Sequence, residues 1–161
     1  MQVHSLSVLA GKSLLPNLQT DRLSQPTADT QSHTFQHRST LEKKRRALVV
    51  DDVADVTEML AVLLTHAGYE VVTAGSAAAA IDSARRDQFD VIISDIGMPY
   101  MNGYELAREL RNLPNYQTVP MVALTGFSKF DDRQRSLDAG FNAHLTKPIE
   151  PRELLDLIEQ L

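Results

Sequence analysis

The sequence has no cysteine, no tryptophan and few other aromatic residues. The absence of cysteine excludes disulfides, thiolate metal sites and a cysteine nucleophile. The formal net charge of -5 leaves no basic excess for a general nucleic-acid binder. No apolar run reaches the ~20 residues of a membrane-spanning helix, and no positively charged stretch opens the chain as in an export signal. We therefore expect a cytoplasmic protein with no direct nucleic-acid binding and no membrane insertion.

The composition of the chain changes near residue 46. Residues 1 to about 40 are rich in Ser, Thr, Gln, Asn and His and show no apolar period. Such a stretch cannot bury enough surface to offset its ordering entropy. We interpret residues 1–45 as a polar, disordered tail and the basic run 43–46 as a solvated flank. We assign residues 46–161 to one globular domain.

Short apolar runs alternate with helical patterns from Ala47 to the end, which is typical of strand–helix repeats and a parallel sheet. Three of the five runs are almost entirely apolar, as strands covered on both faces should be. About 116 residues are too few for an eight-stranded barrel. The sequence therefore predicts an α/β fold with an open, doubly wound, five-stranded parallel sheet. The predicted strands are residues 47–50, 70–74, 91–94, 119–124 and 143–145.

Helical periodicity is clearest before Gly68, a residue typical of a helix C-terminal cap. Ser76 can cap a second helix, and Pro151 suits the first position of the last helix. Residues 103–111 and 131–139 supply the remaining two. The apolar face of the first helix is predicted to comprise Val56, Met59, Leu60, Leu63, Leu64 and Ala67.

Polar residues follow the strands at the edge where such sheets bind ligands, beyond the carboxyl ends. Asp51 and Asp52 follow the first strand, Asp95 the third, Thr125 the fourth and Lys147 the fifth. Taken singly, each fits a turn or a helix cap. Together they place three carboxylates, a hydroxyl and an ammonium at one edge. Crowded carboxylates raise one another's pKa values unless a cation is bound.

Oxygen ligands without His or Cys favour a hard cation such as Mg²⁺, which takes one or two carboxylates plus phosphate oxygens and water. Ca²⁺ needs more ligands than the sequence offers. Mg²⁺ beside Asp95 would neutralise an incoming phosphoryl group, and Lys147 would pair with the same oxygens. This chemistry makes Asp95 a candidate nucleophile for phosphoryl transfer.

Four segments of the sequence resemble the receiver domains of two-component response regulators, and the resemblance covers residues 46–161. The segments are LVVDD (48–52), IISDIGMPYMNG (92–103), ALTG (123–126) and HLTKPI (144–149). The resemblance implies a flavodoxin-like (βα)5 fold and a phosphoacceptor switch rather than an enzyme.

The same resemblance implies a role for each site residue. Asp51 and Asp52 place Mg²⁺, Asp95 accepts the phosphoryl group and also binds the metal, and the carbonyl of Gly97 is a further metal ligand.

The resemblance also implies a switch. Thr125 turns toward the new phosphoryl group, Lys147 pairs with it, and the bond between Lys147 and Pro148 is cis. His144 stands where the family commonly has a Tyr or Phe coupled to the threonine. A packed, neutral His144 would copy the aromatic movement, whereas an exposed one would make the switch sensitive to pH near ~6.5. We favour the packed histidine.

The implied phosphodonor is a histidine kinase or a histidine phosphotransfer protein. A downstream protein, of a kind that the sequence does not define, would dock on the fourth helix, fifth strand and fifth helix, at about residues 130–161. A phosphorylation-dependent dimer is a further implied assembly. Because the chain ends within the last predicted helix, we expect no output domain. The alternative is a terminal receiver module of a hybrid histidine kinase.

Two other functions fit less well. A phosphatase of the haloacid dehalogenase type needs a second acid two residues after the nucleophile, where Gly97 stands. A flavodoxin-like electron carrier needs a phosphate-binding loop after the first strand, where Asp51 and Asp52 would repel phosphate.

Limited proteolysis tests the division of the chain. Because residues 1 to about 40 lack the apolar surface to fold, cleavage should leave a stable core that begins near Lys44, as determined by mass spectrometry of the fragment. Strong hydrogen-exchange protection within residues 24–38 would contradict this prediction.

Overall fold

The fold is described from a computed structural model, which covers residues 43–126 and 130–161. The tail predicted for residues 1–45 lies outside the described residues except for its last three, and its division from the domain stays a prediction. None of the described helices is long and apolar enough to span a membrane. The strands are β1 (Arg46–Val50), β2 (Glu70–Ala74), β3 (Val91–Asp95), β4 (Met121–Thr125) and β5 (Ala143–Thr146). The helices are α1 (Ala54–His66), α2 (Ala77–Arg86), α3 (Gly103–Asn112), the 3-10 helix η1 (Pro114–Tyr116), α4 (Phe130–Ala139) and α5 (Pro151–Glu159).

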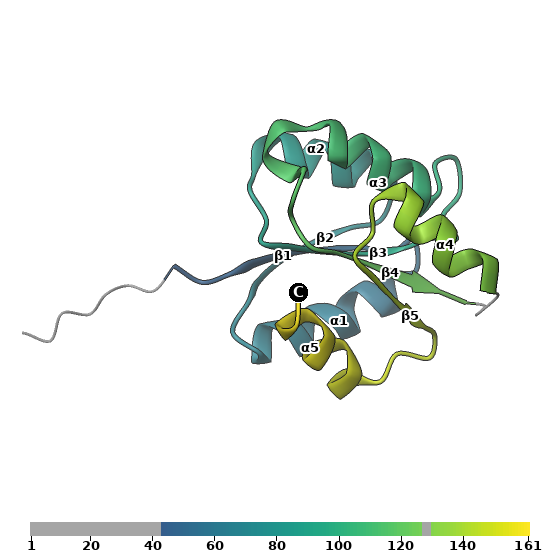
Figure 1. The fold of residues 1–161 in the computed structure, drawn as a ribbon. Helices are drawn as coiled ribbons and strands as arrows, with labels where there is room; N and C mark the ends of the chain where they lie inside the picture. Colours follow the sequence, from purple (N-terminus) through teal and green to yellow (C-terminus); the bar gives the residue numbers. More distant parts are fainter. Residues whose placement is uncertain (1–42, 127–129) are drawn as a thin grey trace, which may run out of the picture. The chain divides into compact units, whose positions relative to one another are not determined.

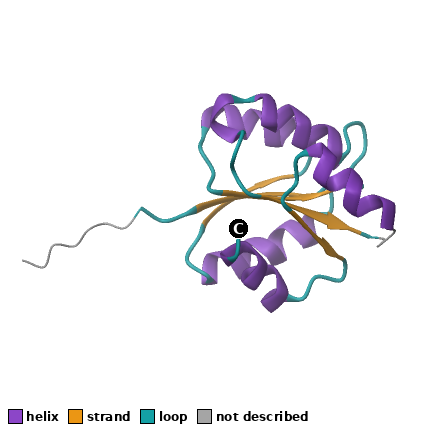
Figure 2. Ribbon diagram, in the orientation of Figure 1, coloured by secondary structure: helices purple, strands orange, loops and turns teal. Residues whose placement is uncertain are grey.

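All five strands run parallel in one sheet with the order β2-β1-β3-β4-β5. Helices α2, α3 and α4 cover one face and α1 and α5 cover the other (Figure 1), so the strands lie between two helical layers (Figure 2). The predicted doubly wound α/β fold is confirmed. The strand order reverses at β1, because β2 lies on one side of it and β3 on the other. Ligands of such sheets bind beyond the carboxyl ends of the strands at this point.

Side chains of the central strands alternate between two cores, one on each face of the sheet. Leu48 and Val50 join the core beneath α2 and α3, whereas Ala47 and Val49 join the core beneath α1 and α5. All five residues of β3 and all five of β4 are buried. Helices on both faces explain why these strands are nearly continuous apolar runs in the sequence.

Predicted helix ends are confirmed at three positions. The hydroxyl of Ser76 caps α2, Gly68 follows the end of α1 with a φ of 91°, and Pro151 is the first residue of α5. Helix α3 has a capping box in which the side chains of Asn102 and Glu105 each accept a backbone N–H at 3.0 Å. This box fixes where the chain turns from the end of β3 into α3.

Some predicted element ends are wrong. The fourth strand begins at Met121, two residues later than predicted, because Pro120 has no N–H to pair with a neighbouring strand. The Met121 N–H donates to the side chain of Asn142 at 2.9 Å. The last helix ends at Glu159 rather than at the chain end, and Leu161 is 44% exposed.

Two surface interpretations also need correction. Met59, predicted on the apolar face of α1, is 49% exposed because the helix packs through Leu60 and Leu64. In the run 43–46, predicted as a solvated flank, Arg46 is half-buried and forms ion pairs at 3.0 Å with a carboxylate in β2 and another after α2. The remaining three basic residues are exposed as predicted.

A close approach between α3 and the end of β3 requires glycine at position 103. The Gly103 N–H donates to the carbonyl of Ile96 at 3.0 Å. A Cβ at this position would clash with the Asp95 carbonyl oxygen and would lie 2.8 Å from the Cα of Ile96. Because these neighbours are backbone atoms, they cannot move aside cheaply. Gly103 therefore holds the loop that follows Asp95 against the sheet edge.

Gly103→Ala should lower the free energy of unfolding by about 1 to 3 kcal/mol, as overpacking typically does. Urea denaturation measures this change. Gly75→Ala is the matched control, because a Cβ at Gly75 would meet nothing within 4 Å. Equal stability of the two variants would contradict the predicted clash.

Candidate functional site

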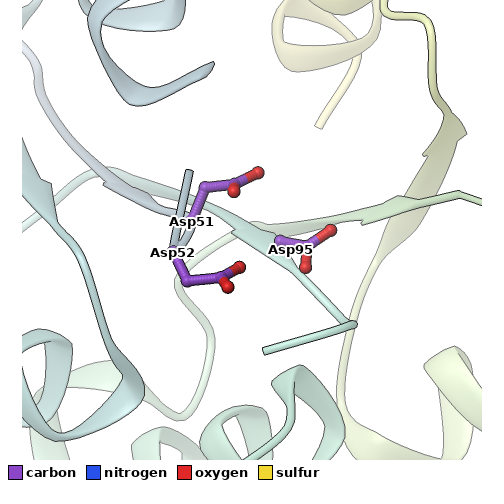
Figure 3. A group of neighbouring side chains, drawn as sticks. All are labelled: Asp51, Asp52 and Asp95. Atoms are coloured by element: carbon purple, nitrogen blue, oxygen red, sulfur yellow. The ribbon is translucent and has the colours of Figure 1, made fainter. Parts of the chain in front are cut away.

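Three aspartates meet at the carboxyl edge of the sheet. Asp51 and Asp52 follow β1 directly, and Asp95 is the last residue of β3. One oxygen from each carboxylate lies within 4.8 Å of the other two, and Figure 3 shows the side chains projecting from the neighbouring strand ends. Asp51 and Asp95 are buried, whereas Asp52 is exposed. Among the described residues, this is the one acidic or histidine cluster close enough to share a metal ion.

The register of the sheet explains why these residues come together. Asp51 and Asp95 both lie at the paired ends of β1 and β3, so their side chains emerge at one level. Thr125 ends β4, and the N–H of Lys147 donates to the Thr125 carbonyl at 2.7 Å just after β5 ends. Residues from four strands, far apart in sequence, therefore share one edge.

Lys147 forms ion pairs with two of the three aspartates. Its Nζ lies 2.7 Å from Oδ2 of Asp51 and 2.8 Å from Oδ1 of Asp95. Burial disfavours the ammonium charge, but hydrogen bonds and Coulomb attraction from both carboxylates outweigh this effect and raise the pKa of Lys147. The ammonium therefore remains charged at neutral pH and offsets part of the carboxylate repulsion.

The two buried carboxylates differ in how their second oxygens are used. Oδ1 of Asp51 accepts the backbone N–H of Val53 at 2.9 Å, so both oxygens of Asp51 have donors. Oδ2 of Asp95 lies beside Gly97, where a Cβ would come within 3.3 Å of it. Glycine at position 97 thus places no side chain of its own beside this oxygen. Both oxygens of Asp51 are therefore held by hydrogen bonds, whereas Oδ2 of Asp95 faces the backbone of Gly97.

The two predicted switch residues lie at different depths. Thr125 is buried at the site edge with 6% exposure. His144 is half-buried on β5 and lines an open groove with α5 residues such as Glu153 and Asp156. His144 is thus neither fully packed nor fully exposed, and its coupling to Thr125 stays a prediction. The peptide bond after Lys147 is cis, as the resemblance implies.

The donor set suits a hard divalent cation. Three carboxylates without imidazole or thiolate favour Mg²⁺ over softer metals. The exposure of Asp52 leaves one side of the cluster open for the water ligands that Mg²⁺ usually keeps. Asp51, Asp52 and Asp95 are therefore the residues that would hold the ion.

A family model described as the response regulator receiver domain matches residues 47–159, well over half of the chain. The chain belongs to this family. Receiver domains are the phosphoacceptors of two-component signal transduction, and members of the family bind Mg²⁺ at an acidic site. This receiver domain has such an acidic cluster in Asp51, Asp52 and Asp95.

Two curated relatives differ in how much of their length the receiver domain covers. It is 41% identical over 113 residues to an uncharacterized 14.6 kDa protein in the sodA1 3' region of Leptolyngbya boryana, covering 70% of this chain and 86% of that one. It is 36% identical over 114 residues to the probable transcriptional regulator ycf27 of Guillardia theta, covering 71% of this chain but 44% of that protein. The chain thus spans less than half the length of this longer relative.

Solved structures give the same fold. The chemotaxis protein CheY4 of Vibrio cholerae superposes with a TM-score of 0.71 at 34% identity, covering 73% of this chain and 98% of that one. The receiver domain of the sensor histidine kinase PA1611 of Pseudomonas aeruginosa, solved with a magnesium ion in its active-site cleft, gives a TM-score of 0.68 at 31% identity, with 73% and 97% coverage. The flavodoxin-like receiver fold implied by the sequence motifs is confirmed.

Sequence reasoning locates the site but misses its internal contacts. The sequence pairs Lys147 with phosphoryl oxygens, whereas the structure places it on Asp51 as well as Asp95. It also misses the backbone donor of Val53, because a main-chain N–H leaves no signal in a sequence. The individual roles of the site residues stay predictions.

Titration with MgCl₂ tests the acidic cluster as a metal site. Mg²⁺ should raise the unfolding temperature of the wild-type protein, because a ligand that binds only the folded state stabilises it. Asp52→Asn removes one charge with little change in shape. Its unfolding temperature should therefore rise less with Mg²⁺, by an amount that corresponds to a Mg²⁺ affinity about tenfold weaker. Calorimetry across the titration measures both.

Asp82→Asn is the matched control for this titration, since Asp82 is an exposed carboxylate on α2, outside the cluster. The control should respond to Mg²⁺ as the wild type does. Equal responses of the Asp52 and Asp82 variants would contradict the assignment.

Proposed function

We propose that this receiver domain takes a phosphoryl group onto Asp95 from a phosphohistidine on a histidine kinase or a histidine phosphotransfer protein. The observation that carries the proposal is the pairing of the Lys147 ammonium with Asp95 and Asp51 at the carboxyl edge. The ammonium at this position can pair with the Asp95 carboxylate before transfer and with the phosphoryl oxygens after it. Residues 46–161 would perform this role.

The transfer itself needs few groups from the chain. An oxygen of the Asp95 carboxylate attacks phosphorus, the phosphorus–nitrogen bond breaks, and the imidazole nitrogen of the donor keeps the electron pair. Because Gly97 has no side chain beside Oδ2 of Asp95, this residue does not obstruct a phosphoryl group that arrives in line. Lys147 then exchanges a carboxylate partner for a phosphoryl oxygen.

Mg²⁺ fits this proposal as the resident cation. Asp51, Asp52 and Asp95 would hold it, with the carbonyl of Gly97 as the further ligand that the family resemblance implies. When bound, the ion neutralises charge on the transferred phosphoryl group. In this proposal the three aspartates hold the Mg²⁺ ion, and Lys147 stabilises the phosphorylated form of Asp95.

The phosphorylated state would act through the surface formed by α4, β5 and α5. Phosphorylation adds roughly -1.5 to -2 charges to the pocket. The Thr125 hydroxyl would turn toward the new group, and His144 on the adjoining strand would follow it. Lys147 and Thr125 already share a backbone hydrogen bond of 2.7 Å, so a shift at one is transmitted to the other strand. The equilibrium then favours a conformation that a downstream protein, or a second copy of the chain, can bind.

A second setting for the same activity is a receiver module of a hybrid histidine kinase. The similarity to the receiver domain of the sensor kinase PA1611 supports this alternative. In both settings the domain acts as a signalling phosphoacceptor and not as an enzyme with an external substrate.

Labelling with acetyl phosphate tests the proposal directly. With Mg²⁺ present, the intact mass of the wild-type protein should increase by one phosphoryl group, because Asp95 pairs with Lys147 through one oxygen and has its other oxygen beside Gly97. Asp95→Asn should abolish the labelling, while Asp82→Asn, on the exposed face of α2, should retain it. A wild-type chain that stays unlabelled would refute the proposed function.

A further inference from the structure

Tyr100 is the most exposed large hydrophobic residue in the part of the chain that the structure describes. Its relative exposure is 107%, whereas the next, Val62, is 58% exposed. A single exposed apolar residue is ordinary on a protein surface. A fully exposed aromatic ring, however, gains none of the burial that makes aromatic residues stabilising.

The backbone of Tyr100 is unusual as well. Its φ is 68°, and it is the one non-glycine residue with a positive φ among the described residues. The left-handed region is unfavourable for bulky side chains, whereas glycine adopts it without a steric cost. The chain therefore keeps a tyrosine where glycine would fit the backbone better.

The loop that carries Tyr100 is anchored on both sides. Met98 is buried in the core beneath α2 and α3, and Met101 packs against the same core. The hydrogen bond from the Gly103 N–H to the Ile96 carbonyl closes the loop at its base. The exposed ring is thus held on an ordered backbone, which lowers the entropic cost of contacting a partner.

Tyr100 also lies near the phosphoacceptor carboxylate. The Cβ position of Gly97 is 3.3 Å from Oδ2 of Asp95, and three peptide spacings, at most about 11 Å, separate Gly97 from Tyr100. Beside the ring is a hollow lined also by Met101, Glu105, Arg108 and Glu109. Because Tyr100 is within this distance of the site, a protein that brings a phosphohistidine to Asp95 can contact the ring, whereas a small donor can reach the carboxylate without touching it.

We propose that Tyr100 is a contact residue for the phosphodonor protein and packs against its surface beside the phosphohistidine. The inference rests on the proposed phosphoacceptor function. Rigid aromatic anchors with an adjoining hollow are typical of the residues that dominate binding at protein interfaces. The strained backbone fits the same role, since strain retained at one position points to a function that a relaxed residue would lose. The ring positions the donor and takes no part in the chemistry.

The test compares a protein donor with a small donor. The autophosphorylated histidine kinases and phosphotransfer proteins of the same source are first screened for the one that labels the wild-type chain fastest. With that donor, Tyr100→Ala and Tyr100→Gly should be phosphorylated about tenfold more slowly than wild type. With acetyl phosphate, both should be labelled within about twofold of the wild-type rate.

Stability separates this role from a structural one. Tyr100→Gly relieves the backbone strain, so it should unfold at the wild-type temperature or above it. Leu161→Ala is the matched control, because it removes a partly exposed apolar side chain at the end of the chain, after α5. This control should keep the wild-type rate with both donors.

Each remaining outcome overturns the inference. Equal transfer from the protein donor to all variants would show that the ring makes no productive contact. Slower labelling by acetyl phosphate, or faster loss of the phosphoryl group, would place the ring over the site itself. A lower unfolding temperature of Tyr100→Gly would show a structural role. If acetyl phosphate labels the wild type but no phosphohistidine protein does, the inference fails alone; if neither labels it, the proposed function fails first.

Discussion

The receiver site depends on one ammonium group shared by two buried carboxylates. The Lys147 side chain is 27% exposed, while those of Asp51 and Asp95 are 0% and 8% exposed. Removing one partner from a fully buried ion pair typically costs about 3 to 5 kcal/mol, because the other charge stays desolvated. Because Lys147 is partly exposed, we expect the loss of one of its partners to cost less than it would in a fully buried ion pair. In the proposed function, the ammonium that offsets the carboxylate charges in the folded pocket is also the group that pairs with the phosphoryl oxygens.

The topology of the sheet brings these charges together. Asp51 and Lys147 are 96 residues apart in the chain, and only the parallel arrangement of β1, β3 and β5 puts their strand ends at one edge. The backbone bond between Lys147 and Thr125 joins the site to β4 and β5, and thereby to the helices that follow them. The proposed chemistry at Asp95 and the proposed response of α4 and α5 would therefore be linked through hydrogen-bonded strands rather than through a flexible path.

The sequence predicts the sheet and the site edge because both depend on strong local patterns. Apolar runs buried on both faces give β3 and β4, and the polar residues at the strand ends give Asp51, Asp95 and Lys147. Features that depend on three-dimensional contacts are not predictable in this way. The exposure of Met59 follows from the angle at which α1 packs, and the need for glycine at position 103 follows from a backbone approach made by residues of β3.

The central claim is that Asp95, and no other carboxylate of the cluster, carries the phosphoryl group. Borohydride reduction converts an aspartyl phosphate to homoserine, so peptide mass spectrometry of the phosphorylated and reduced protein locates the modified residue. The account predicts homoserine at position 95, with Asp51 and Asp52 unchanged, because only Asp95 has an oxygen beside the space left by Gly97. Homoserine at position 51 or 52, or at an exposed carboxylate elsewhere, would contradict it.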